Sequence, residues 1–148
     1  MITLIYTDAS YDKRYHEAGL GVVIYRHSHN APTQTNHYQQ CVKSTDSNLA
    51  ELQAVLFALS KIDDADDHII IMTDNKNVKQ TIKRPNREEY TGERAELGKR
   101  IRKILDSSPD RTYKIYHVKG HSMSTDQHSK NQKLCDKMAN ATRKAKHK

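Results

Sequence analysis

The sequence predicts a single α/β domain in which helices pack on one mixed β-sheet. With 148 residues, the chain is long enough for one hydrophobic core and too short for two. Strand-like segments occupy its first third and form consecutive hairpins, whereas helices and strands alternate in the rest. This order of elements is typical of a domain whose first strands pair as hairpins and whose later helices cover the sheet.

The first strands are predicted from segments rich in β-branched and aromatic residues, which are residues 2–8, 18–25 and 37–42. We expect Asp8 to end the first strand, polar residues 10–17 to turn the chain, and residues 27–36 to connect the next two strands. Gly19 and Gly21 lie within the second strand. Glycine at such positions indicates either a bulge or the close approach of another backbone segment.

The remaining elements are predicted from hydrophobic spacing, and they are helices at residues 47–62, 75–83, 88–105 and from 127 onward, with strands at 68–73 and 111–118. Residues 44–48 are of types that favour the N-cap of the first helix. The continuous apolar run at 68–73 is typical of a strand buried on both faces. Residues 119–126 are predicted to form a loop. Basic residues 143–148 are predicted to form a tail that frays, which leaves a domain of residues 1–142.

The composition narrows the classes of function. A net charge of +7 favours a polyanionic partner such as nucleic acid. No apolar run approaches the roughly 18–20 residues of a membrane span, and the apolar run at the N-terminus is too short for a signal peptide. Cys41 and Cys135 lie far apart and form no CxxC motif, which predicts structural thiols in a reduced, cytoplasmic protein.

Three acids lie at positions that suggest chemistry. Asp8 and Asp74 each follow a predicted strand, and Glu51 lies in the first turns of a predicted helix. Each acid alone has an ordinary explanation as a turn residue, a cap or a partner of the helix dipole. In an open α/β sheet, however, the carboxyl ends of adjacent strands meet in one crevice. Carboxylates that lie so near one another repel, and a bound hard cation such as Mg²⁺ or Mn²⁺ relieves the repulsion.

Five short motifs follow one another along the chain: Thr7-Asp8-Ala9-Ser10, Asn48-Leu49-Ala50-Glu51-Leu52, Thr73-Asp74-Asn75, Val118-Lys119-Gly120-His121-Ser122 and Cys135-Asp136-Lys137-Met138-Ala139. Together they resemble the successive signatures of type 1 ribonuclease H, a family of metal-dependent endonucleases that cut the RNA strand of RNA–DNA hybrids. The resemblance covers nearly the whole chain. It implies a five-stranded mixed sheet, with antiparallel strands first and parallel strands after them, and helices on both faces.

The resemblance also implies roles for particular residues. The metal ligands would be the four acids Asp8, Glu51, Asp74 and Asp136, which would hold two Mg²⁺ ions, with Mn²⁺ as a possible substitute. His121 would assist proton transfer or product release, and Asn48 would contact the nucleic acid near the cleavage site. The implied reaction is an in-line displacement at phosphorus that leaves 5′-phosphate and 3′-hydroxyl ends. The RNA–DNA hybrid is the expected partner, and we expect the protein to be a monomer.

The sequence departs from the family in its substrate-binding parts. Many bacterial members carry a basic, tryptophan-containing insertion, the handle, which binds substrate. This chain has no tryptophan, and residues 83–94 are too few for the full insertion. Other residues must therefore contact the nucleic acid, and the candidates are Ser10, Asn48, Lys76, Lys79 and Lys83, together with Arg94, Lys99, Arg100, Arg102 and Lys103. Gln132 stands where many members have asparagine.

Other interpretations of the same residues remain open. One is a non-catalytic nucleic-acid-binding protein of the same superfold, and another is a nuclease of that superfold with a different specificity, for example a junction resolvase or a transposase-like domain. Intact acids argue against the first, and the motifs around Asn48 and His121 argue against the second. A zinc site made from His117, His121, His128 and Cys135 is disfavoured, because their spacing matches no zinc pattern.

Overall fold

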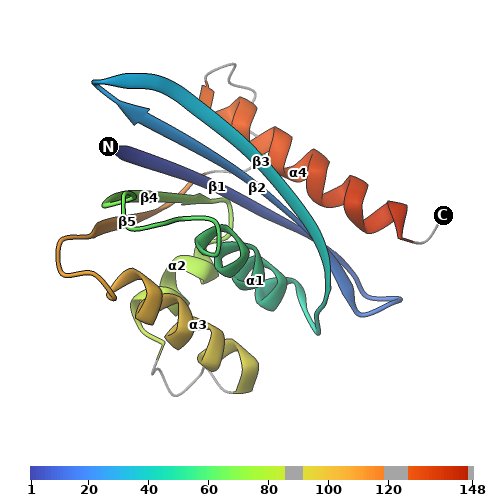
Figure 1. Ribbon diagram of the computed structural model, residues 1–148. Coiled ribbons are helices and arrows are strands. Elements are labelled where there is room, and N and C mark those ends of the chain that lie inside the picture. Colours follow the sequence, from blue (N-terminus) through green and yellow to red (C-terminus); the bar gives the residue numbers. More distant parts are fainter. Residues whose placement is uncertain (86–91, 119–126, 147–148) are drawn as a thin grey trace.

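The protein has one five-stranded sheet, and helices pack on both of its faces (Figure 1). The computed structural model describes residues 1–85, 92–118 and 127–146. The strands are β1 (Ile2–Asp12), β2 (Glu17–Ser28), β3 (Ala31–Lys43), β4 (His68–Thr73) and β5 (Thr112–His117). Their order in the sheet is β3-β2-β1-β4-β5. The first three pair antiparallel, and β4 and β5 continue the sheet in parallel with β1, which confirms the predicted fold.

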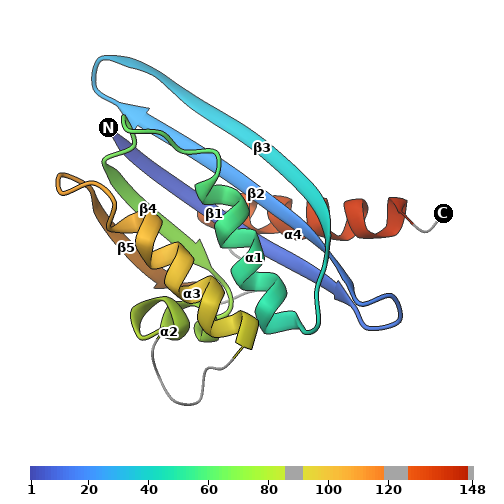
Figure 2. The same ribbon diagram turned by 60° about the horizontal axis from the view of Figure 1, so that its bottom comes forward.

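The helices divide unequally between the two faces. They are α1 (Ser47–Leu59), α2 (Lys76–Lys83), α3 (Gly92–Leu105) and α4 (Gln127–Ala145). Helices α1, α2 and α3 cover one face, and α4 crosses the other (Figure 2). Buried side chains of α1 and α3 pack on Ile5, Ile69 and Ile71 to form the main core. No helix among the described residues is long and apolar enough to cross a membrane.

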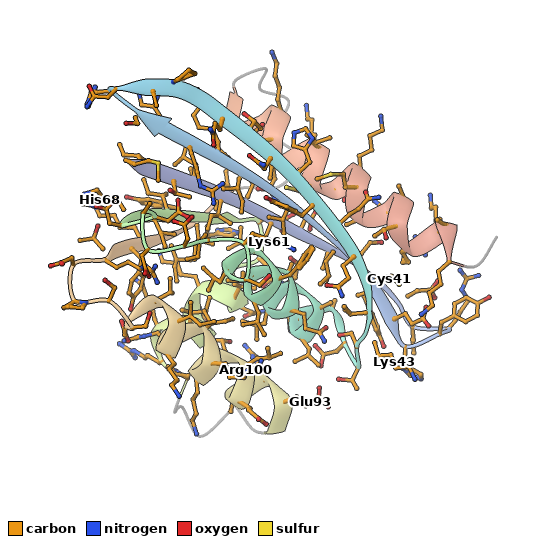
Figure 3. All side chains as sticks on the ribbon, viewed as in Figure 1. Cys41, Lys43, Lys61, His68, Glu93 and Arg100 are labelled. Carbon is orange, nitrogen blue, oxygen red and sulfur yellow. The ribbon has the colours of Figure 1, made fainter. Side chains whose placement is uncertain are left out.

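The hairpin strands are longer than the sequence predicts. β1 and β2 stay paired to their ends, where Asp12 lies opposite Glu17, so the predicted turn over residues 10–17 shortens to 13–16. The prediction that β3 begins near residue 37 is also wrong, since β3 begins at Ala31. Its side chains are mostly exposed because β3 is the edge of the sheet, and Cys41 and Lys43 mark its end in Figure 3. An exposed edge strand carries no hydrophobic pattern, and its extent therefore escaped the sequence analysis.

The two glycines of β2 allow α4 to touch the sheet backbone. A Cβ atom on Gly19 would lie 1.9 Å from the carbonyl oxygen of Ala139, and one on Gly21 would lie 2.2 Å from that of Cys135. Both distances are far shorter than van der Waals contact, so no side chain fits at either position. Of the two explanations that the sequence left open, the close approach of another backbone segment is confirmed.

Replacing Gly21 with alanine should therefore destabilise the fold, because the added methyl group must push α4 away from β2. We expect the free energy of unfolding to fall by about 1–3 kcal/mol, as for other overpacked sites. Denaturant unfolding measures the change. Gly98→Ala in α3 is the matched control: its Cβ would meet only contacts of 3.1 Å or more, and alanine favours a helix. A Gly21→Ala protein as stable as Gly98→Ala would contradict the packing described above.

Helix α4 continues past the point where the sequence predicts a fraying tail. It runs to Ala145 and includes Arg143. The Arg143 guanidinium donates to Ser10 Oγ at 2.7 Å and to Asp12 Oδ2 at 3.0 Å, which fastens this end of the helix to β1. The fraying prediction is thus wrong for Arg143, because its long side chain finds acceptors on a strand that is distant in sequence.

Candidate active site

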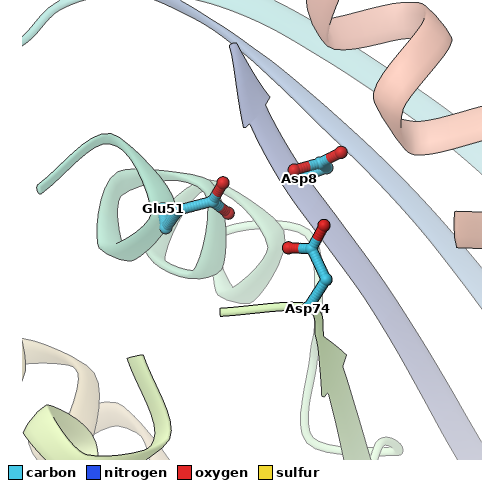
Figure 4. A group of neighbouring side chains, drawn as sticks. All are labelled: Asp8, Glu51 and Asp74. Atoms are coloured by element: carbon cyan, nitrogen blue, oxygen red, sulfur yellow. The ribbon is translucent and has the colours of Figure 1, made fainter. Parts of the chain in front are cut away.

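Three carboxylates from separate elements converge on one point beside the sheet (Figure 4). Asp8 lies in β1, Glu51 in α1, and Asp74 directly after the end of β4. One oxygen from each carboxylate lies within 4.8 Å of the others. Elements that are 43 and 23 residues apart in sequence therefore build a single acidic cluster.

The position of Asp8 differs from the prediction, although the convergence is confirmed. Asp8 does not end β1, because β1 continues to Asp12 in antiparallel pairing with β2. The parallel pairing of β1 with β4, however, ends near Asp8, and its last residue pair is Tyr6 with Met72. β4 stops one residue later at Thr73, and this leaves room beside β1 for the side chains of Asp8 and Asp74.

Caps and amide contacts fix the helix starts that surround the cluster. Asp46 Oδ1 accepts from the Leu49 N–H at 2.8 Å and so caps α1. Asn48 Oδ1 accepts from the side-chain amides of Asn75 and Asn77 at 3.1 and 3.3 Å. These bonds join the start of α1 to the start of α2 and hold the backbone that carries Glu51 close to the backbone that carries Asp74.

Burial and mutual repulsion disfavour the charged forms of these acids. Asp8 and Glu51 are only 5% and 8% exposed. Burial first and the charge of Asp74 second raise the pKa of Asp8 to about 7, although the Ala9 N–H donates to Oδ1 at 2.9 Å and opposes the rise. The pKa of Glu51 lies well above its usual range because of burial, and then because of Asp8 and Asp74. The cluster is thus built at a cost that a bound cation offsets.

The cluster fits a hard divalent cation. Its donors are carboxylate oxygens, the ligands that such ions prefer. Glu51 Oε2 is buried and has no hydrogen-bond partner among the described residues. A buried charged oxygen without a partner is costly, and a cation between the acids would satisfy it.

The fourth predicted acid, Asp136, lies on α4 and is exposed. Its charge is among the causes that raise the pKa of Asp8, so it acts on the same site, but it is not part of the close group of three. α4 is held there by Gln132 Nε2, which donates to the Thr7 carbonyl at 2.9 Å, and by the Cys135 thiol, which donates to the Tyr6 carbonyl at 3.2 Å. These bonds place Asp136 beside the strand that carries Asp8.

The other predicted site residues divide into three groups. Lys76, Lys79 and Lys83 lie on α2, which begins two residues after Asp74. The Ser10 hydroxyl donates to Asn140 Oδ1 at 2.7 Å and accepts from Arg143, so α4 already engages it. His121 lies outside the described residues. Its role stays a prediction.

Two contacts at the site were not predicted from the sequence. His117, at the end of β5, donates from Nε2 to the Asp74 carbonyl at 3.0 Å. Asn75 caps α2 by accepting from the Asn77 N–H at 2.8 Å, and its side-chain amide also reaches Asn48. An asparagine that follows a strand and precedes a helix is a recognisable cap signal. The contact from His117 depends on the pairing of β4 with β5, which no local pattern reveals.

The fold and the site together define an α/β protein with a carboxylate cluster that fits a divalent metal, at the carboxyl end of its parallel strands. The sequence model of the RNase H family matches residues 2–144. The chain therefore belongs to the RNase H family and is a ribonuclease H hydrolase. A search among curated protein sequences found no match.

Solved structures of RNase H proteins share the fold. The RNase H domain of prototype foamy virus is 21% identical, with a TM-score of 0.72 over 97% of this chain and 94% of that domain. RNase H1 of the archaeon Halobacterium salinarum is 18% identical, with a TM-score of 0.70 over 98% and 99% of the two chains. LC11-RNase H1, solved in complex with an RNA/DNA hybrid, is 19% identical, with a TM-score of 0.70 over 97% and 98%.

Proposed function

We propose that the protein hydrolyses the RNA strand of RNA–DNA hybrids as an endonuclease that depends on two Mg²⁺ ions, and that it leaves 5′-phosphate and 3′-hydroxyl ends. The observation that carries this proposal is the convergence of Asp8, Glu51 and Asp74 in a family of ribonucleases H. The known hybrid complex of LC11-RNase H1 supports the choice of substrate.

The four acids together form the proposed set of metal ligands. Asp8, Glu51 and Asp74 hold the metal from the sheet side, and Asp136 completes the ligand set from α4. When bound, the metal ions supply the positive charge that makes a water nucleophilic near neutral pH and stabilises the departing oxygen. His121 moves a proton or helps the product to leave. None of the four acids needs to change its protonation during turnover once cations neutralise the cluster.

Asn48 and Ser10 are the proposed contacts to the nucleic acid next to the acids. Asn48 lies in the first turn of α1, three residues before Glu51, and its Oδ1 is held by the amides of α2. A side chain held in this way is oriented before substrate arrives, and this lowers the entropy cost of binding. Discrimination of RNA from DNA requires contact with the 2′-hydroxyl. We assign that contact to Asn48 and Glu51.

Cleavage of four nucleic acids tests the proposed function: an RNA–DNA hybrid, double-stranded RNA, double-stranded DNA and a four-way junction. We expect cleavage of the RNA strand of the hybrid alone, with products that a ligase can rejoin without end repair because they carry 5′-phosphate and 3′-hydroxyl ends. Binding of all four without cleavage would indicate a non-catalytic protein, and cleavage of the junction would indicate a resolvase. Size-exclusion chromatography of the same sample tests the expectation of a monomer.

The lysines of α2 should contribute binding energy rather than chemistry. Phosphate contacts remote from the scissile bond hold the ground state and the transition state alike, so their loss raises KM and leaves kcat nearly unchanged. We expect Lys79→Glu with Lys83→Glu to raise KM by about 10-fold or more and to flatten its salt dependence. The control is Lys13→Glu with Lys144→Glu, exposed lysines at the β1–β2 turn and on α4, which changes net charge equally. Equal effects in both pairs would show that only net charge matters.

A further inference from the structure

Two hollows of basic lining meet on the outer side of α2 and α3. The first, of about 440 Å³, begins at His117 and Lys76 next to Asp74 and extends to Lys83 and Arg84. The second, of about 550 Å³, begins at the same Lys83 and Arg84 and extends along α3, where Lys99 and Lys103 line it. α2 and α3 lie side by side in both views of the ribbon (Figures 1 and 2). The hollows share residues and therefore form one continuous surface, which we call the basic track.

The structure separates the cations of α3 into those that face the track and those that do not. Lys99 and Lys103 are exposed and line the track. Arg102 lines it too, but its guanidinium donates to the carbonyls of Ile82 and Lys83 and to Asp106, so it caps the end of α2. Arg100 (labelled in Figure 3), which the sequence offered as a candidate contact, lies on another side of α3, where it lines a groove next to α1 together with Glu96. It is therefore not part of the track.

Within residues 1–85 and 92–118, positive charge predominates among the residues that line the track. The described residues place no carboxylate within ion-pair distance of Lys83, Arg84, Lys99 or Lys103. Among the residues that the structure describes, Asp106 is the only acid that lines either hollow, and Arg102 pairs with it at 3.3 Å. Because α2 has 8 residues with a rise of about 1.5 Å each, the track reaches about 12 Å beyond its start before α3 extends it.

We propose that the basic track binds backbone phosphates of the nucleic-acid duplex on one side of the cleavage site, and that Lys99 and Lys103 are its far contacts. The proposal rests on the proposed function and names the part of the chain that binds substrate in the absence of a handle. A polyanion fits, since almost every charged residue described along the track is a lysine or an arginine. Phosphates of one strand repeat about every 3.4 Å along the helix axis, so a track of this length that runs parallel to the axis spans roughly four of them.

Fluorescence anisotropy in EDTA measures hybrid binding without turnover, so its result is independent of whether the protein cleaves. The variants are Lys99→Gln, Lys103→Gln and both together, and the control is Arg100→Gln, the neighbouring residue on the same helix. On a hybrid of about 20 base pairs, we expect the double variant to bind about 10-fold more weakly and to lower the slope of log K against log salt by about 2. Arg100→Gln should match the parent.

Length provides the second test. A hybrid of about 4 base pairs, closed by a loop so that it stays paired, spans only roughly 14 Å and does not reach from the acidic cluster to the far end of the track, so the double variant should lose far less affinity for it than for the long hybrid. The proposal is overturned if Arg100→Gln weakens binding as much as Lys99→Gln does. It is also overturned if the double variant leaves the salt slope unchanged or weakens both hybrids equally. Failure of the parent to cleave hybrids would instead overturn the proposed function.

Discussion

Asp74→Asn should remove nearly all cleavage while the fold stays intact. An amide has the size of the carboxylate but supplies no negative charge to the cations, and a catalytic metal contributes several kcal/mol to transition-state stabilisation. We expect the rate to fall by about 10³-fold or more, which corresponds to roughly 4 kcal/mol. Initial rates at saturating Mg²⁺ and calorimetric metal titration measure the two effects. Asp64→Asn, on the exposed loop after α1, is the control and should retain full activity.

Asp74→Asn should not reduce the stability of the metal-free protein, although it removes cleavage. Asp8 has a raised pKa of about 7 against an ordinary 3.8, so the folded state binds a proton more tightly than the unfolded state does. The contribution of Asp8 to the free energy of unfolding is therefore fully present below about pH 4 and is lost as the pH rises through 7. Asp74 contributes to the rise, so Asp74→Asn should reduce the loss and be at least as stable as the parent at pH 7.5. Full cleavage activity, or metal-free unfolding at neutral pH, in this variant would contradict the assigned role.

His121→Ala should slow turnover by about 10²-fold, the range typical of general acid–base groups. The expected role is proton transfer or product release, not metal binding, so the calorimetric affinity for Mg²⁺ should stay within twofold of the parent. The measurement is kcat at saturating substrate and metal. Slower turnover with unchanged metal binding separates His121 from the four acids.

A histidine far from the site is the appropriate comparison for His121. His37 is exposed on β3, at the edge of the sheet, and His37→Ala should leave both kcat and metal affinity unchanged. Loss of metal binding in His121→Ala would show that the residue is a ligand. Unchanged kcat would show that it takes no part in the rate-limiting step.

Much of the fold was predictable because its buried elements carry local patterns. The apolar run of β4 gave its position correctly. The periodic apolar residues of α1 gave its start, although α1 ends at Leu59 and not at residue 62 as predicted. Features that depend on distant partners were not predictable. Asp66 sits in a loop that reads as a simple acidic turn, yet it is fully buried and accepts from Thr3 Oγ1 at 2.7 Å and from Arg26 at 2.9 Å. Nothing near Asp66 in sequence announces these partners.

The features of the site likewise divide into those that local sequence patterns predict and those that depend on distant partners. The sequence predicted that Asp8 and Asp74 meet, because strand ends converge in such sheets. It could not show that β1 runs on past Asp8, since Ala9 to Asp12 form no continuous apolar run of their own and are held in the strand by pairing with Glu17 to Leu20. Nor could it sort the arginines and lysines of α3, because the partner of Arg102 is the end of α2. The spacing of residues along a helix shows which of them share a face. Only the packing of the helix shows which face is exposed to solvent.

Magnesium titration of RNA-strand cleavage tests the central claim most directly. The protein is first stripped of metal with EDTA, and a hybrid labelled separately on each strand is then incubated with increasing Mg²⁺. The account predicts no cleavage without the ion, cleavage of the RNA strand alone as Mg²⁺ rises, and no recovery at any Mg²⁺ concentration in Asp74→Asn. Cleavage that persists in EDTA, or cleavage of the labelled DNA strand, would contradict a metal-dependent hybrid nuclease built on Asp8, Glu51 and Asp74.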